Sequence, residues 1–142
     1  MNNNDDLLGS IPDANLIEQL KQETKDLLWL SESEYPWSIF YFADAANFTP
    51  QTLLQQHNYP PETKIAIKQL TAFFSSAIIV EAWHNEDEQE EVTRYQDLVN
   101  LLSEKLTDIK VYLLGEVEID VYVLGTTTKG AIAGIATKIV AT

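Results

Sequence analysis

Three carboxylates in the C-terminal part of the chain have the alternating spacing of a small metal site. Glu116, Glu118 and Asp120 alternate with apolar residues in GEVEIDVYVLG, Gly115 to Gly125. Because strand side chains point alternately to two faces, this pattern predicts a half-buried strand with the acids on one face. Carboxylate oxygens suit Mg²⁺ or Ca²⁺, so a metal-dependent hydrolase using this row, with His84, is one function that the sequence allows. Same-face carboxylates lie about 7 Å apart along a strand, too far to hold one ion unaided, so we interpret the row mainly as a solvated face.

A second group of acids surrounds a tryptophan. The segment EAWHNEDEQEE, Glu81 to Glu91, contains six acidic residues beside Trp83 and His84. Acids at the start of a helix are stabilised by its dipole, which explains several of them without a function. Trp is also enriched among the residues that dominate binding energy at interfaces. Glu81 and Trp83 are therefore candidate partner-binding residues, with core packing as the alternative for Trp83.

Further anions come from two other parts of the chain. Glu32 and Glu34 belong to the polar turn SESEYP, which Pro36 separates from the helix before it. They are either solvated loop charges or a loop that carries recognition. The carboxylate of Thr142 directly follows the last strand-like run. A terminus held by a strand is a placed anion, and we expect it to have a role in binding.

The sequence contains none of the enzyme motifs that were considered. There is no cysteine, and only His57 and His84 offer imidazole nitrogens. The glycine spacing of GTTTKG resembles a phosphate loop, but the Lys and Ser/Thr that would contact phosphate and metal are replaced by Ala131 and Ile132. No metalloprotease motif and no nucleophile elbow are found. We expect a protein that is not an enzyme, with no catalytic residue, no cofactor and no metal of its own.

Composition indicates one acidic domain. The chain has 142 residues with 22 Asp and Glu against 9 Lys and Arg, a net charge of −13. We predict a single domain over 1–142, with the polar residues 1–9 mobile. An acidic surface repels nucleic acid and anionic membranes and attracts basic proteins. No signal peptide or membrane-spanning run is recognised, and we expect a soluble, cytoplasmic protein.

Periodicity places these residues on helices followed by strands. Apolar spacing predicts helices from Ser10 to about Leu30 and from about Glu88 to Leu106, and Thr49 with Pro50 begins a short helix to Gln56. Extended patterns predict a buried strand at Trp37–Phe42 and consecutive strands at 107–114, 115–125 and 131–142, the last two joined as a hairpin. The segment 64–67 fits strand or helix, and a helical stripe runs from Leu70 to Ile78. The order predicts an α+β fold in which helices cover an antiparallel-rich sheet.

Two segments carry a family resemblance. LLWLSESEYPWSIF at 27–40 and VYLLGEVEIDVYVLGTTTKGAIAGIATKIVAT at 111–142 resemble the nuclease A inhibitor family, small acidic cyanobacterial proteins. The resemblance implies an α-β-α sandwich similar to the pathogenesis-related protein 1 fold. It also implies tight, one-to-one inhibition of a sugar-non-specific, Mg²⁺-dependent DNA/RNA endonuclease of the ββα-metal type.

The resemblance also assigns roles to single residues. It implies that Glu32 pairs with an active-site arginine of the nuclease, that Trp83 is the family's tryptophan in the acidic segment, and that the Thr142 carboxylate reaches the nuclease's metal-bound water. Two positions depart from the family pattern, since Glu81 replaces Gln and Ala82 replaces Asp. The predicted function is to block the nuclease cleft without contacting nucleic acid or membrane; an acidic scaffold or ligand carrier is a third interpretation. The predicted partner-binding residues, which we expect to share one end of the sheet, are Glu32, Glu34, Glu81, Trp83 and Thr142.

Overall fold

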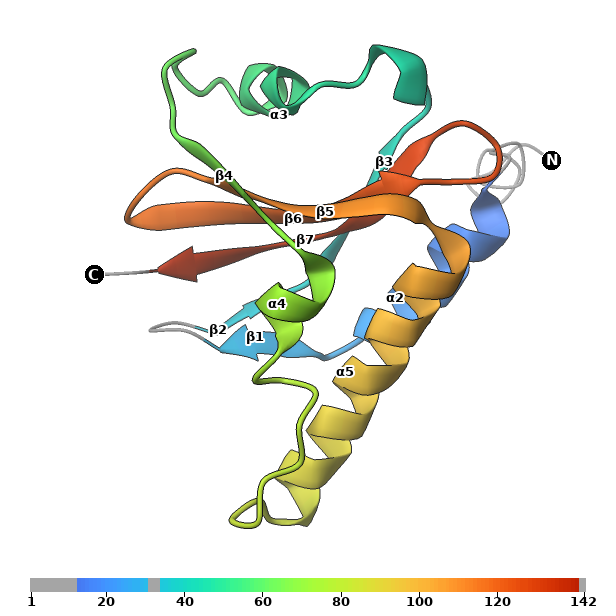
Figure 1. Ribbon diagram of the computed structural model, residues 1–142, viewed down its shortest axis with the longest axis vertical. Coiled ribbons are helices and arrows are strands. Elements are labelled where there is room, and N and C mark those ends of the chain that lie inside the picture. The colour runs from blue at the N-terminus through green and yellow to red at the C-terminus, as the bar shows by residue number, and fades with distance from the viewer. Residues whose placement is uncertain (1–12, 31–33, 141–142) are drawn as a thin grey trace, which may run out of the picture.

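A five-stranded antiparallel sheet forms the middle layer of the structure (Figure 1). The computed structural model describes residues 13–30 and 34–140. Strand order in the sheet is β3-β7-β6-β5-β4, and each neighbouring pair is antiparallel. The strands are β3 (Ser38–Phe42), β4 (Ile65–Lys68), β5 (Thr107–Leu114), β6 (Glu118–Thr126) and β7 (Ile132–Val140). A separate two-stranded hairpin consists of β1 (Leu28–Leu30) and β2 (Glu34–Pro36).

Helices cover both faces of this sheet (Figure 1). On one face lie α2 (Ala14–Thr24), α4 (Leu70–Phe74) and α5 (Glu86–Lys105), together with the β1–β2 hairpin. On the other face lie α3 (Pro50–Gln56) and a short 3₁₀ helix, η1 (Ala45–Asn47). The predicted α+β class with an antiparallel sheet is confirmed, and the layers follow the order helix, sheet, helix.

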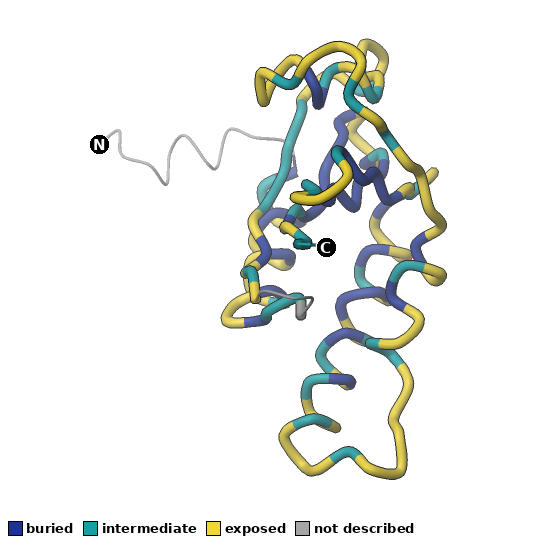
Figure 2. Tube along the Cα trace, turned by 90° about the vertical axis from the view of Figure 1, so that its left-hand side faces the viewer, coloured by how far each residue is buried: buried dark blue, intermediate teal, exposed yellow. Residues whose placement is uncertain are grey.

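The central strands are buried on both faces, which corrects the prediction of a half-buried strand. From Val121 to Gly125 every residue of β6 is buried. The buried stretches of the chain lie in the interior, where the sheet and the helices face one another (Figure 2). Val121 and Val123 belong to the larger core under α2, α4 and α5, whereas Tyr122 and Leu124 belong to the smaller core under α3. The prediction was wrong because alternation was extended from the polar start of the strand into a part where both faces carry apolar side chains. Residues of a sheet covered on both sides are apolar in succession.

The first helix ends earlier than the apolar spacing predicts. It stops at Thr24, whose Oγ1 donates to the Leu20 carbonyl at 2.7 Å. Asp26 then adopts a left-handed conformation with φ of 59°, and the chain continues as β1 instead of as helix to Leu30. Leu27 is buried in the larger core, so it has the expected environment without the expected helix. The predicted start at Ser10 lies outside the described residues.

The starts of α3 and α5 lie at or near the residues where the sequence predicts them. Helix α3 begins with Thr49 as N-cap and Pro50 in the first turn, as predicted, and the structure adds a capping box between Thr49 and Thr52. Helix α5 begins at Glu86, two residues before the predicted start, because the capping box is formed by Asn85 and Glu88. Residues 65–67 of the ambiguous segment 64–67 belong to strand β4, and the helical stripe from Leu70 is regular helix only to Phe74. None of the described helices is long and apolar enough to cross a membrane.

The two longest C-terminal strands form the predicted hairpin. In its register Thr126 is opposite Ile132 and Glu118 is opposite Val140. Thr127 closes the turn, since its Oγ1 accepts from the Ala131 amide at 3.2 Å and donates to Asp13 at 2.8 Å. The predicted strand at Trp37–Phe42 is confirmed as β3 from Ser38 onward, but only Trp37, just before it, is fully buried. Ser38 is exposed and the other residues are partly buried, because β3 is an edge strand.

Candidate partner-binding surface

The predicted binding residues fall on three segments, of which the structure describes only part. Glu32 and Thr142 lie outside the described residues. Glu34 is the first residue of β2 and is exposed. Glu81 and Trp83 lie in the segment 75–85 between α4 and α5, which we call the Trp83 loop, and both are exposed. The Trp83 side chain is 71% exposed, so the alternative of core packing for this residue is wrong.

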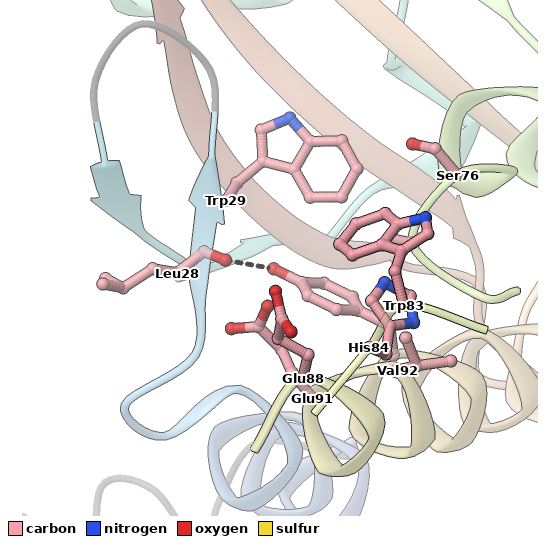
Figure 3. Close-up of a pocket in the computed structure, with 10 residues that line it drawn as sticks. Leu28, Trp29, Ser76, Trp83, His84, Glu88, Glu91 and Val92 are labelled. Atoms are coloured by element: carbon pink, nitrogen blue, oxygen red, sulfur yellow. Dashed lines mark hydrogen bonds between the residues drawn. The ribbon is translucent and has the colours of Figure 1, made fainter. Parts of the chain in front are cut away.

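The β1–β2 hairpin and the Trp83 loop border one cavity of about 230 Å³ (Figure 3). The hairpin contributes Leu28 and Trp29, and α5 forms the floor. The structure therefore brings together two of the three segments in which binding residues were predicted. The other lining residues are Ser76, Ala77, Trp83, His84, Glu88, Glu91, Val92 and Tyr95.

Buried aromatic contacts hold the hairpin side of this cavity. The Tyr95 hydroxyl donates to the Leu28 carbonyl at 2.6 Å and accepts from Nε1 of Trp37 at 3.0 Å. The Trp29 ring stacks on Phe73 with centroids 4.9 Å apart and meets the Tyr95 ring edge-on at 5.5 Å. Burial raises the pKa of Tyr95. The phenol is thus a neutral hydrogen-bonding link between α5, β1 and the residue before β3.

Hydrogen bonds to the main chain give the Trp83 loop a defined shape. The Glu81 amide donates to Nδ1 of His84 at 2.8 Å, and the His84 amide donates back to the Glu81 carbonyl at 3.1 Å. From α5, the side-chain amide of Gln96 donates to the Ile78 carbonyl at 2.8 Å. The Trp83 ring lies against His84 with centroids 4.2 Å apart. A large apolar side chain is therefore presented to solvent from an ordered turn, which reduces the entropy lost on binding.

The last strand lies beside the hairpin. Thr137 Oγ1 donates to the Pro36 carbonyl at 2.9 Å, joining β7 to the end of β2. Strands β1 and β7 run toward the same side of the molecule (Figure 1). Thr142 follows two residues after the end of β7 at Val140.

The carboxylates around the cavity have no cationic partners among the described residues. In residues 13–30 and 34–140 the single ion pair joins Glu18 to Lys21 at 3.9 Å. The Glu88 carboxylate accepts from the Asn85 amide at 2.9 Å, and the Glu91 carboxylate has no hydrogen bond to the described residues. Uncompensated carboxylates on one surface attract cationic groups.

The row of carboxylates that suggested a metal site is divided between two elements. Glu116 lies in the turn before β6, whereas Glu118 and Asp120 are on the strand. The Tyr59 hydroxyl donates to Asp120, and Lys138 is its cross-strand neighbour. No group of at least three His, Cys, Asp or Glu side chains that could hold a metal ion occurs in the part of the chain that the structure describes. The placement gives no support to the hydrolase alternative.

Sequence reasoning did not identify several residues of the cavity. Trp29, Tyr95 and Val92 have the apolar spacing of core residues, and nothing in the sequence distinguishes a cavity wall from a core. Glu88 and Glu91 were recognised only as acids at the start of a helix. Their spacing of three residues on α5 was the available signal, since it places both on one side of a helix.

One family comparison covers nearly all of this structure. The model of the family described as Nuclease A inhibitor-like protein matches residues 14–142. None of the curated proteins that were compared with the chain matches it. The family match begins at the first residue of α2 and includes the hairpin, the Trp83 loop and β7. The chain belongs to the nuclease A inhibitor-like protein family.

Proposed function

We propose that this protein inhibits a sugar-non-specific, Mg²⁺-dependent DNA/RNA nuclease by binding one-to-one over its active-site cleft. Family membership supports the class of partner. The observation that carries the proposal is the joint placement of the β1–β2 hairpin and the Trp83 loop around one cavity with acidic and aromatic walls. These two segments come from distant parts of the sequence, and both contain residues for which the family resemblance implies a contact.

Electrostatics gives a reason for such a complex. A nuclease cleft has cationic side chains and Mg²⁺ to bind a phosphodiester. A protein with a net charge of −13 is drawn to that cleft by long-range attraction. In our proposal the carboxylates of Glu32, Glu34 and Glu81 take positions of phosphate groups, and Glu32 pairs with an arginine through charge-assisted hydrogen bonds. Trp83 supplies the apolar anchor.

The terminal carboxylate has a separate part in the proposal. Thr137 of β7 is hydrogen-bonded to the Pro36 carbonyl of β2, and this contact between the last described strand and the hairpin supports a role for the carboxylate that follows in the sequence. We propose that the Thr142 carboxylate binds the water coordinated to the nuclease's Mg²⁺. We also propose, from the resemblance, that the helix-sheet-helix arrangement is related to the pathogenesis-related protein 1 fold, which superposition of the two folds tests.

A cleavage assay tests the function directly. A sugar-non-specific, Mg²⁺-dependent nuclease of the ββα-metal type is titrated with the protein while cleavage of double-stranded DNA is followed. We expect activity to fall linearly and to vanish at one equivalent, and light scattering to show a one-to-one complex. A metal-independent nuclease serves as the control and should keep its activity. Undiminished cleavage in large molar excess of the protein, across several nucleases of this type, would contradict the proposal.

A further inference from the structure

The cavity between the hairpin and the Trp83 loop has aromatic walls on more than one side. Trp29 lines it from the hairpin and Trp83 from the Trp83 loop (Figure 3). Tyr95 lines it from α5. The ring of Trp29 is fixed by its stack on Phe73 and its edge contact with Tyr95. Aromatic faces attract cations through their quadrupole, and Trp does so most strongly. The walls thus favour a positively charged group.

Two carboxylates complete this environment. Glu88 and Glu91 lie three residues apart on α5 and extend toward the side of the cavity that holds Trp29 (Figure 3). Both are only partly exposed, so water screens their charges less than it would on an open surface. Two like charges that share a partly desolvated site are stabilised when a cation enters.

The protein supplies no such cation from the neighbouring helix turn. Arg94 is three residues beyond Glu91, but its Nη2 donates to the carbonyls of Lys25 at 2.6 Å and Glu23 at 3.2 Å. It therefore caps α2 and does not line the cavity. His84 does line it, but its Nδ1 accepts the Glu81 amide. The carboxylates keep their attraction for a group from outside.

The size of the cavity limits what that group can be. Its volume of about 230 Å³ is below the range of roughly 300–1,000 Å³ that is usual for drug-sized ligands. It accommodates the end of one side chain. A planar guanidinium stacks on aromatic rings and donates to two carboxylates at once, whereas an ammonium is a strongly hydrated point charge.

We propose that this cavity is a receptor for one arginine side chain of the bound partner protein. The identity of the partner as a nuclease rests on the function proposed above, but the preference for a guanidinium rests only on the cavity. Glu91 and Glu88 receive the guanidinium, and Trp29 and Trp83 enclose it. This gives the complex a contact in which the inhibitor is the receptor, in addition to the contacts in which it supplies the anion to the nuclease cleft.

The first test uses the isolated protein and a blocked arginine. N-acetyl-L-arginine methylamide is titrated while the indole N–H signals of Trp29 and Trp83 are followed by NMR. We expect saturable shifts of both, with a dissociation constant on the order of millimolar. The citrulline analogue has the same shape without the charge and should produce no saturable shift, and the lysine analogue should bind more weakly. Amides of Leu53 and Leu54, on the opposite face of the sheet, serve as an internal reference.

Matched substitutions on one helix turn test the carboxylates. Glu91→Gln should weaken arginine binding about fivefold or more. Glu90→Gln removes the same charge from an adjacent exposed position that does not line the cavity, and it should change binding less than twofold. Circular dichroism checks that both variants are folded. Equal binding of arginine and citrulline analogues, or equal effects of the two substitutions, would overturn the assignment.

A second arm uses the nuclease. For a nuclease that the protein inhibits, Glu91→Gln should raise the inhibition constant about tenfold and Glu90→Gln less than twofold. If the blocked arginine binds but Glu91→Gln leaves inhibition unchanged, the site takes a free cation and the assignment to a partner side chain is wrong. If the wild-type protein inhibits no nuclease, the proposed function fails, and the NMR titration still decides whether the cavity binds a guanidinium.

Discussion

The Tyr95 hydroxyl links three segments on the hairpin side of the candidate partner-binding surface. Replacing it with Phe removes the hydroxyl that donates to Leu28 and accepts from Trp37. The indole N–H of Trp37, in a side chain only 7% exposed, then has no acceptor. We expect a loss of about 1–3 kcal/mol in the free energy of unfolding, measured by urea denaturation. Tyr35→Phe is the control, with an expected change within about 0.5 kcal/mol. Equal stability of the two variants would show that the Tyr95 link is dispensable.

Substitution of Trp83 is expected to affect binding of the partner but not the stability of the protein. Because its side chain is 71% exposed, Trp83→Ala should change the free energy of unfolding by less than about 0.5 kcal/mol. Removal of an interface anchor should nevertheless weaken inhibition of a nuclease by about thirtyfold or more. Val117→Ala, at a position 56% exposed in the β5–β6 turn, provides the comparison and should leave inhibition unaltered. An undiminished Trp83→Ala inhibitor would remove this residue from the interface.

The two anions outside the described residues are tested through inhibition alone. Glu32→Gln should cost about 2–5 kcal/mol of binding free energy if its partner is a buried arginine. Addition of one glycine after Thr142 should weaken inhibition as well, because it moves the carboxylate out of the position that we propose for it at the metal-bound water. Inhibition constants are compared with those of Glu104→Gln, an exposed position at the far end of α5. Values equal to that control would exclude a direct role.

At the level of elements, α2 depends on a donor from α5. The Arg94 guanidinium hydrogen-bonds two carbonyls at the end of α2, those of Glu23 and Lys25. Arg94→Met keeps the aliphatic stem and removes these donors along with the charge at the helix C-terminus. The expected loss is about 1–2 kcal/mol in the free energy of unfolding. Faster hydrogen exchange at the last turn of α2 should accompany it, whereas Lys105→Met, which removes a charge from the last turn of α5, should leave exchange in α2 unchanged.

The sequence predicts an element well when the contacts that define its ends are made by residues close together in the chain. The helices α3 and α5 begin at capping boxes formed by residues three apart, so a short window contains their signal. The end of α2 depends on Arg94, about 70 residues away in sequence, and no local pattern shows it. The β1–β2 hairpin has three residues in each strand, too few for an alternating pattern. This hairpin is half of the candidate site, and the sequence alone identified it only as a polar turn.

At the scale of the whole molecule, buried tyrosines link stability to alkaline pH. Burial is the main cause that raises the pKa values of Tyr41, Tyr95 and Tyr112 above 10.0 and that of Tyr122 to about 12. The unfolded chain loses these phenolic protons near pH 10, whereas the folded protein retains them. Their stabilising contribution is therefore complete below about pH 10 and is lost as the pH rises toward about 12.

Urea denaturation across this range tests the linkage. We expect the free energy of unfolding to fall as the pH rises above about 10. The absorbance of tyrosinate should appear at a higher pH in the folded protein than in the unfolded chain. Tyr122→Phe should make this decline in the free energy of unfolding shallower, whereas Tyr35→Phe, at a partly exposed position of β2, should reproduce the wild-type slope. A stability that is independent of pH up to about 12 would contradict the expected burial of the phenols.

The candidate site could be foreseen from the sequence only in part. The acidic segment, its tryptophan and the SESEYP turn were found because charge and aromatic type are visible without a structure. Their common cavity was not, since it depends on Trp29 and Tyr95, which look like ordinary core residues, and on the Trp83 loop being held by Gln96 from α5. The charge and aromatic character of a residue can be read directly from the sequence. The approach of two distant segments can be seen only once the helices and the sheet are packed together.

The sheet has two cores that do not share side chains, and this partition affects how the protein can change over evolutionary time. Leu53 and Leu54 of α3 pack only against the sheet face opposite the hairpin and the Trp83 loop. Sequence change in the α3 layer is constrained by volume and polarity, while under the proposed function the opposite layer must also keep a shape fitted to the partner protein. The two halves of one small domain are therefore free to diverge at different rates.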